Sequence, residues 1–247
     1  MEKIDELNSY LRLKSKIVGI KLFDSEIKTK IQRRPKKKLI ICQIINAARL
    51  YGWAWMILSE DVECILGAIA LGLREESFVN IKEVFMRLGY VSDDESARKF
   101  ASKIPRIEKT KRGFVIGPLE VFDIEPDLLI MYGNSAQIMR MVQSTVYAMG
   151  GERLTFSTSG DCGICGDGIA SAYITERPQV VIPCYGERRF GHSQDDELAM
   201  VIPFKYLEGI IEGLRKTHNA GIRYPIPIAA VITELEVPKE LSVRTLS

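Results

Sequence analysis

Five cysteines are the residues of this chain best suited to hold a metal ion or a metal cluster. Cys162 and Cys165 form a C-x-x-C in the glycine-rich segment SGDCGICGDG, a spacing that lets two thiolates converge on one ion or cluster. Asp161 precedes the pair and is expected to cap a short helix, whose free N–H groups favour the thiolate. The sequence has no second C-x-x-C, which disfavours a zinc ribbon, and one such pair alone is a weak signal.

The other three cysteines also fall near the expected ends of helices and strands. Cys64 follows a second expected cap, Asp61, by three residues; Cys42 begins a helix, and Cys184 ends an apolar strand. Core packing explains such cysteines without any ligand, because cysteine is among the most buried residue types. A shared metal or iron–sulfur site and thiol redox chemistry are the alternatives.

Arg188, Arg189 and Asn134 are the candidates for binding a small molecule or an anion. The two arginines lie in the expected loop YGERRFG, and guanidinium groups bind carboxylate or phosphate through a fork of N–H groups. Asn134 opens the longest expected helix, where free N–H groups attract anions. Plain N-capping explains Asn134 better, since no glycine-rich fingerprint is present, and a solvated loop explains the arginines equally well.

Helices and strands are expected to interleave along the chain, which predicts an α/β or α+β fold. Helices are expected at 2–13, 39–51, 61–73, 136–149 and 204–217, with two short ones within 80–104; strands are expected at 16–23, 53–58, 113–122, 127–132, 153–158, 179–184, 198–202 and 226–235. We expect one compact domain over residues 1–247 with a mixed sheet. Residues 17–73 and 127–175 share an order of elements and would be pseudo-equivalent halves if the chain arose by duplication.

Composition limits the class of protein and its partners. The 247 residues carry a net charge of +2, with 46% hydrophobic and 27% charged residues, which is typical of a globular protein. The basic segment 28–38 lacks interleaved aromatic residues to stack on bases, so no nucleic-acid partner is expected. The longest apolar stretch, residues 65–73, is too short to cross a membrane. A charged N-terminus and an odd number of cysteines predict a cytoplasmic protein.

Long segments of the chain are similar to a known family. GFVIGPLEVFDIEPDLLIMYGNSAQIMRMVQ, VVIPCYGERRFGHSQDDELAMVIP and IEGLRKTHNAGIRYPIP resemble the archaeal and bacterial family called uncharacterised ArCR, and LIICQIINAARLYG and EDVECILGAIALGL resemble its N-terminal half. The resemblance implies a single cytoplasmic domain with no established activity. It also implies one cysteine at each of four positions, Cys42, Cys64, Cys165 and Cys184, with Cys162 as an addition of this sequence.

The resemblance therefore favours the four-cysteine set over the C-x-x-C pair. Four cysteines without histidine fit a [4Fe–4S] cluster or, as the alternative, a Cys₄ zinc site, whose ligands usually come in close pairs. The leading hypothesis is a cytoplasmic iron–sulfur or metal-binding protein of unassigned reaction, with redox chemistry as one candidate. The second is a metal-free protein with structural cysteines that binds a small molecule or anion through Arg188, Arg189 and Asn134.

Overall fold

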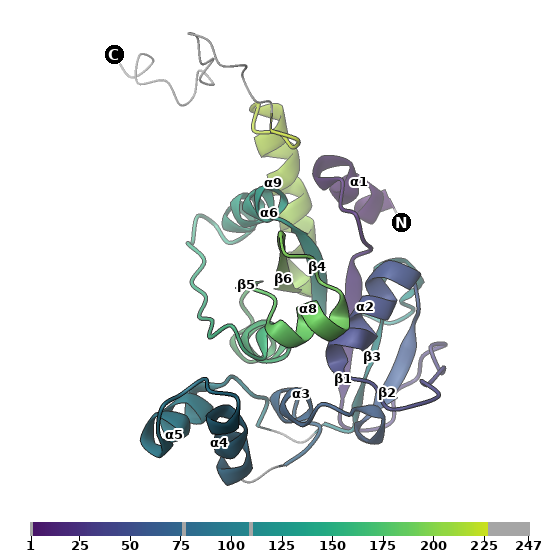
Figure 1. Cartoon of the computed structure of the whole chain (residues 1–247). Helices are drawn as coiled ribbons and strands as arrows, with labels where there is room; N and C mark the ends of the chain where they lie inside the picture. The colour runs from purple at the N-terminus through teal and green to yellow at the C-terminus, as the bar shows by residue number, and fades with distance from the viewer. Residues whose placement is uncertain (1, 76–77, 109–110, 227–247) are drawn as a thin grey trace.

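A computed structural model of the chain describes residues 2–75, 78–108 and 111–226, and these contain a six-stranded sheet (Figure 1). The strands lie in the order β2-β3-β1-β4-β6-β5. Their bounds are β1 (Val18–Phe23), β2 (Trp55–Leu58), β3 (Gly113–Pro118), β4 (Leu128–Asn134), β5 (Gln179–Val181) and β6 (Glu197–Pro203).

The α-helices are α1 (Glu2–Leu11), α2 (Ile41–Tyr51), α3 (Ile65–Ala70), α4 (Phe78–Arg87), α5 (Asp94–Lys103), α6 (Ser135–Ala148), α7 (Ser171–Thr175), α8 (Tyr185–Gly191) and α9 (Leu207–Asn219). A π-helix, Gly163–Ala170, leads directly into α7. No helix in the described ranges combines the length and apolar character needed to cross a bilayer.

The mixed α/β architecture is confirmed, but the expected mixed sheet is wrong. Every neighbouring pair of described strands is antiparallel, and the described parallel contact is an isolated bridge between Leu39 and Val62. Segment 127–132 looks like a parallel strand in sequence because it is apolar throughout. β4 has this composition because both of its faces are buried: Leu128 and Ile130 join one core, and Leu129 and Met131 the other.

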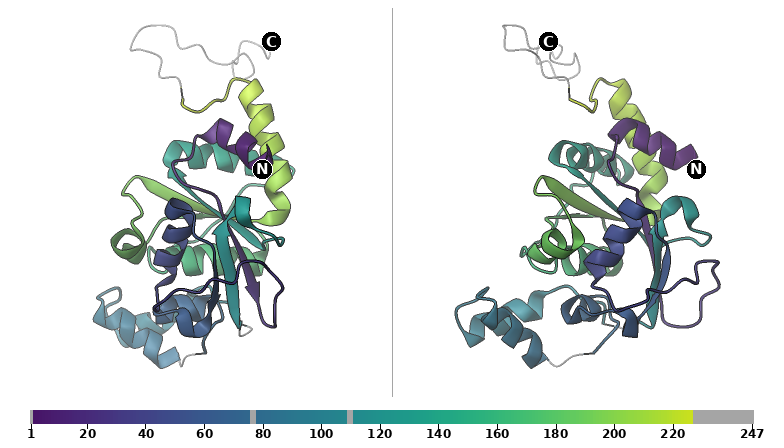
Figure 2. Two further views of the ribbon diagram at one scale, coloured as in Figure 1. Left: turned by 90° about the vertical axis from the view of Figure 1, so that its right-hand side faces the viewer. Right: turned by 45° about the vertical axis from the view of Figure 1, so that its right-hand side comes forward.

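Helices cover the two faces of the sheet unequally (Figure 2). On one face, α2, α3 and the π-helix pack on β1, β3, β4 and β6. On the other face, α1, α6 and α9 cover β4 and β6, while loop residues such as Ile31 and Ile124 cover β1 and β3. The pair α4 and α5 packs against α3, at the end of the molecule opposite α1 and α9.

The boundaries of α2, α5 and α6 agree with their local signals. Gly52 ends α2 in the left-handed region, with φ of 72°, where a glycine has no Cβ to clash. Asp93 caps α5 through the N–H of Ser96, and Asn134 caps α6 through the N–H of Gln137.

Two expected helix caps are wrong, and in both cases a cysteine takes the position. Asp61 ends a short 3-10 turn, where its carboxylate accepts from Leu58 N and binds Arg34, so Cys64 caps α3. Cys162, not Asp161, precedes the first residue of the π-helix. Asp61 lies three residues before the cap position of α3, and the Ile164 N–H in the first turn of the π-helix is taken by Glu187.

Three further segments differ from the sequence expectation or lie outside the described residues. Residues 153–158 form no ladder with the sheet, and the expected loop YGERRFG is helix α8. The expected strand 226–235 lies outside the described residues apart from Ile226. The duplication of 17–73 in 127–175 stays a prediction. The two helices that it would relate, α2 and α6, lie on opposite faces of the sheet.

The close approach of α6 and α9 depends on Gly213 and gives a test of the packing. A Cβ at this position would lie 2.7 Å from the carbonyl oxygen of Ser144 and 2.9 Å from its Cα, and backbone atoms of a packed helix cannot move aside cheaply. Gly213→Ala should therefore lower the free energy of unfolding by about 1–3 kcal/mol. Urea denaturation measures this loss. Lys216→Ala, on the exposed face of α9, is the control. Equal stability of the two variants would contradict the close packing of α6 on α9 at Gly213.

Candidate functional site

All five cysteines line a single cavity of about 930 Å³. They come from four separate parts of the chain: Cys42 from the first turn of α2, Cys64 from the cap of α3, Cys162 and Cys165 from the start of the π-helix, and Cys184 from the cap of α8. Hydrophobic burial alone has no preference for placing sulfur beside sulfur. This convergence is the main feature of the site.

The sulfur atoms are close neighbours. The side chains of Cys165 and Cys184 lie close enough to the Cys42 thiol to shift its pKa. Cys165 Sγ and Cys64 Sγ lie 3.2 Å and 3.6 Å from the position that a Cβ on Gly67 would occupy. The structure therefore brings together the four cysteines that the sequence analysis grouped, and their binding of a metal stays a prediction.

Two glycines make room for this arrangement. A Cβ on Gly191, the last residue of α8, would lie 2.9 Å from Cys42 Cβ and 3.1 Å from Cys42 O, so α8 can approach α2 only without a side chain there. A Cβ on Gly67 would lie 2.9 Å from Ile41 Cδ1 and would also crowd Cys165. Glycine at these two positions lets α2, α3 and α8 come close together around the thiols.

The π-helix gives Cys162 and Cys165 an unusual backbone. Cys162 has φ of 50° and ψ of 33°, a left-handed conformation that is uncommon for residues other than glycine. The wider π turn is a rare conformation, and it occurs frequently at functional sites. Cys165 lies inside the turn and is 5% exposed, whereas Cys162 is half-buried.

The pKa values of the four grouped cysteines lie above the ordinary value for a thiol. Hydrogen bonding to Cys42, together with burial, raises the pKa of Cys184, and hydrogen bonding to Cys165 raises that of Cys42. The Cys42 contact lowers the pKa of Cys165, but burial and the nearby Cys64 outweigh it and raise that pKa to about 12. Burial also raises the pKa of Cys64. Thiolates in this cavity therefore need a compensating positive charge.

Glu187 connects two of the cysteine-bearing elements. Its carboxylate is 1% exposed and accepts from Cys184 N at 3.0 Å, from Ile164 N at 2.9 Å and from the Tyr132 hydroxyl at 3.0 Å. The first two bonds fix the start of α8 against the start of the π-helix. Burial raises the pKa of Glu187, although these hydrogen bonds oppose the shift.

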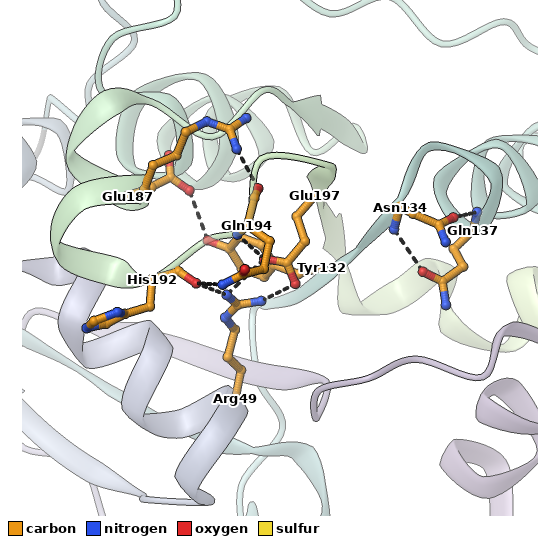
Figure 3. A network of polar contacts seen from close by, with 9 residues as sticks. Arg49, Tyr132, Asn134, Gln137, Glu187, His192, Gln194 and Glu197 are labelled. Atoms are coloured by element: carbon orange, nitrogen blue, oxygen red, sulfur yellow. Dashed lines mark hydrogen bonds and ion pairs between the residues drawn. The ribbon is translucent and has the colours of Figure 1, made fainter.

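A second set of contacts anchors α2 to the sheet (Figure 3). Arg49 is 2% exposed and makes two hydrogen bonds to the Glu197 carboxylate, at 2.9 Å and 3.0 Å. Its guanidinium also lies 4.1 Å from the centre of the Tyr132 ring. Tyr132 thus contacts both Arg49, in the helix that carries Cys42, and Glu187, in the helix that follows Cys184.

The three candidate anion-binding residues are not brought together. Arg188 donates to the carbonyl of Gln194 and lies 3.9 Å from Asp195. Asn134 caps α6 and donates to the Tyr224 hydroxyl at 3.0 Å. Arg189 alone among the three lines the cysteine cavity, where it donates to the Tyr185 hydroxyl at 3.1 Å.

The cysteines do not form a ready-made site for one metal ion. Within the described ranges, no group of three or more His, Cys, Asp or Glu side chains has the arrangement that would hold a single ion. A zinc ion holds its sulfur ligands at about 2.3 Å, so four of them must crowd closely together. An iron–sulfur cluster is larger, because each thiolate binds a different iron of one body.

The comparison with known proteins identifies the family. The model of the family described as Uncharacterised ArCR matches residues 6–213, and the chain belongs to this family. An uncharacterised protein from Methanocaldococcus jannaschii is 28% identical over 179 residues, which cover 70% of this chain and 75% of the relative. No solved structure matches the chain.

The sequence analysis missed the residues that support the cysteines. Glu187 stands three residues after Cys184, the spacing at which a glutamate reaches back to the N–H of the preceding cap residue, so the pattern C-x-x-E was a usable signal. Arg49 and Tyr132 gave no local signal, because their contacts depend on how α2 and β4 meet in three dimensions.

Replacing Glu187 tests whether its carboxylate positions the site. Glu187→Ala leaves two N–H groups and one hydroxyl without their buried acceptor, and we expect it to lower the free energy of unfolding by about 3 kcal/mol or more. Glu187→Gln keeps an oxygen for the two N–H groups and removes a buried charge, so its loss should stay within about 1 kcal/mol. Chemical denaturation separates the two; an equal loss in both variants would show that the hydrogen bonds are unimportant.

Proposed function

We propose that this protein binds a [4Fe–4S] cluster through Cys42, Cys64, Cys165 and Cys184 in the cavity between α2, α3, the π-helix and α8. The observation that carries the proposal is the convergence of these thiols from four distant parts of the chain. A bound cluster would supply a centre for electron transfer or for the activation of a substrate. A reducing cytoplasmic location is part of the proposal, because free thiols and exposed clusters persist there.

The electrostatics of the cavity support a cationic metal core. The raised pKa values show that deprotonating these thiols is unfavourable while no positive charge compensates them. Iron in a cluster core binds thiolates, so loading would release protons and remove this cost. Among the residues that line the cavity, Arg189 is the one cation that the structure describes, which leaves most of the compensation to the metal.

The four proposed ligands also lie near the starts of helices. Cys42 is in the first turn of α2 and Cys165 in the first turn of the π-helix, where the positive end of the helix dipole favours added negative charge. The N–H of Gly67 points to Cys64 Sγ at 3.4 Å. Such N–H donors stabilise cluster sulfur and thiolate in addition to the metal–sulfur bonds.

The site also suggests a role for the fifth cysteine. Cys162 is half-buried, and burial followed by the charge of Asp161 raises its pKa well above the ordinary value. It lies beside the four grouped cysteines and is the dispensable thiol in this proposal.

Metal and sulfide analysis of protein purified without oxygen tests the cluster. We expect about four irons and about four acid-labile sulfides per chain, with broad visible absorption that bleaches on reduction. Losing even an outer-shell partner of a metal ligand costs about 10–100-fold in affinity, so serine at any one of the four grouped cysteines should remove most of the iron. Cys162→Ser is the matched control and should keep it.

The pattern of loss across the five serine variants identifies the ligands. Iron retained in all four ligand variants, with folding confirmed by circular dichroism, would contradict the proposed set. Stoichiometric zinc without sulfide would replace the cluster with a Cys₄ zinc site. Protein with neither metal, from cells grown without oxygen and after reconstitution with iron and sulfide, would favour the metal-free small-molecule binder.

A further inference from the structure

The cysteine cavity has a second region beyond its sulfur-lined wall. Apolar and aromatic side chains line this part: Leu66, Leu88, Tyr90, Tyr185 and Phe190. Leu88, Tyr185 and Phe190 are 60%, 64% and 46% exposed, which places them at the open side. A volume of about 930 Å³ is at the upper end of the range found for small-molecule sites, and it exceeds what four thiols and a cluster need.

The charges lining this cavity are mainly negative. Glu63 and Asp161 contribute two carboxylates, against the single guanidinium of Arg189. A cluster held by four thiolates would add further negative charge. An anionic ligand would therefore meet net repulsion, and a cation would be attracted.

Asp161 has unused hydrogen-bonding capacity inside the cavity. Its Oδ2 atom is buried and has no hydrogen-bond partner. Burial raises the pKa of Asp161, and hydrogen bonding to Cys162 and to Tyr90, whose ring is part of the same wall, opposes the shift. A buried carboxylate oxygen without a partner is costly. The half-buried Asp161 side chain also lines the cavity, where an N–H donor of a ligand can approach its carboxylate.

We propose that the cavity binds a small organic amine, with its ammonium group on Asp161 and its apolar body against Tyr90, Leu66 and Leu88. This inference deepens the proposed function and rests on it in one respect: the cluster would occupy the cysteine end, and the amine would lie beside it as the substrate or effector. Aromatic rings favour such a ligand, since their faces attract cations.

Arg189 does not reverse this preference. It is an exposed residue, it donates to the Tyr185 hydroxyl, and its guanidinium lies 6.0 Å and 5.7 Å from the ring centres of Tyr185 and Phe190. It therefore lies with the exposed aromatic residues of α8, while the unpartnered oxygen of Asp161 is buried. An anion at Arg189 would contact exposed rings and stay partly in water, where an ion pair contributes little.

Three probes of matched size test the ligand class: 2-phenylethylamine, 2-phenylethanol and 3-phenylpropionate. Isothermal titration calorimetry is done with the protein as purified without oxygen. The amine should bind roughly tenfold more tightly than the alcohol, because one partly desolvated ion pair contributes about that much. The propionate should bind most weakly. Asp161→Asn should abolish the difference between amine and alcohol. Asp195→Asn removes the same charge from an exposed position outside the cavity and should leave it unchanged.

The same titration with metal-free protein separates this inference from the proposed function. The amine preference should persist there in weaker form, because Glu63 and Asp161 remain. A protein that holds no iron and still prefers the amine through Asp161 would support this ligand class and overturn the cluster. Equal binding of the three probes, tightest binding of the propionate, or an amine preference that survives Asp161→Asn would overturn the amine site whatever the iron content.

Discussion

A single buried carboxylate organises the cysteine cavity. Glu187 accepts the N–H groups that open the π-helix and α8, so the segments carrying Cys165 and Cys184 are fixed relative to each other. The hydroxyl of Tyr132 completes its hydrogen bonding and ties it to the central strand β4. Burying a carboxylate is expensive unless hydrogen bonds compensate for the lost water, and here three of them do so.

The rest of the site is built around this anchor by close backbone approach. Gly191 lets α8 reach Cys42, and Gly67 lets α3 reach Cys165, so thiols from four elements share one space. Arg49 then fixes the far end of α2 by binding Glu197 and stacking on Tyr132. The polar contacts thus set the positions of the helices, and the glycines set how near the sulfurs come.

Local signals predicted most of the described helices and strands but missed α8. Long-range partners could not be predicted from them. Gly52 and Asn134 mark helix ends through their own backbone chemistry, so α2 and α6 were predictable. Strand direction was not, because a doubly buried antiparallel strand such as β4 has the composition of a parallel one. The grouping of four cysteines came from the resemblance to the family; the support from Glu187 and Arg49 needed the structure.

Anomalous X-ray diffraction from a crystal grown without oxygen tests the central claim most directly. Data collected on either side of the iron edge should show a strong peak inside the cavity, bonded to the sulfurs of Cys42, Cys64, Cys165 and Cys184, with Cys162 outside the bonding distance. A peak at the zinc edge alone would contradict the cluster. Free thiols with no anomalous scatterer between them, in crystals of protein reconstituted with iron and sulfide, would contradict metal binding at this site altogether.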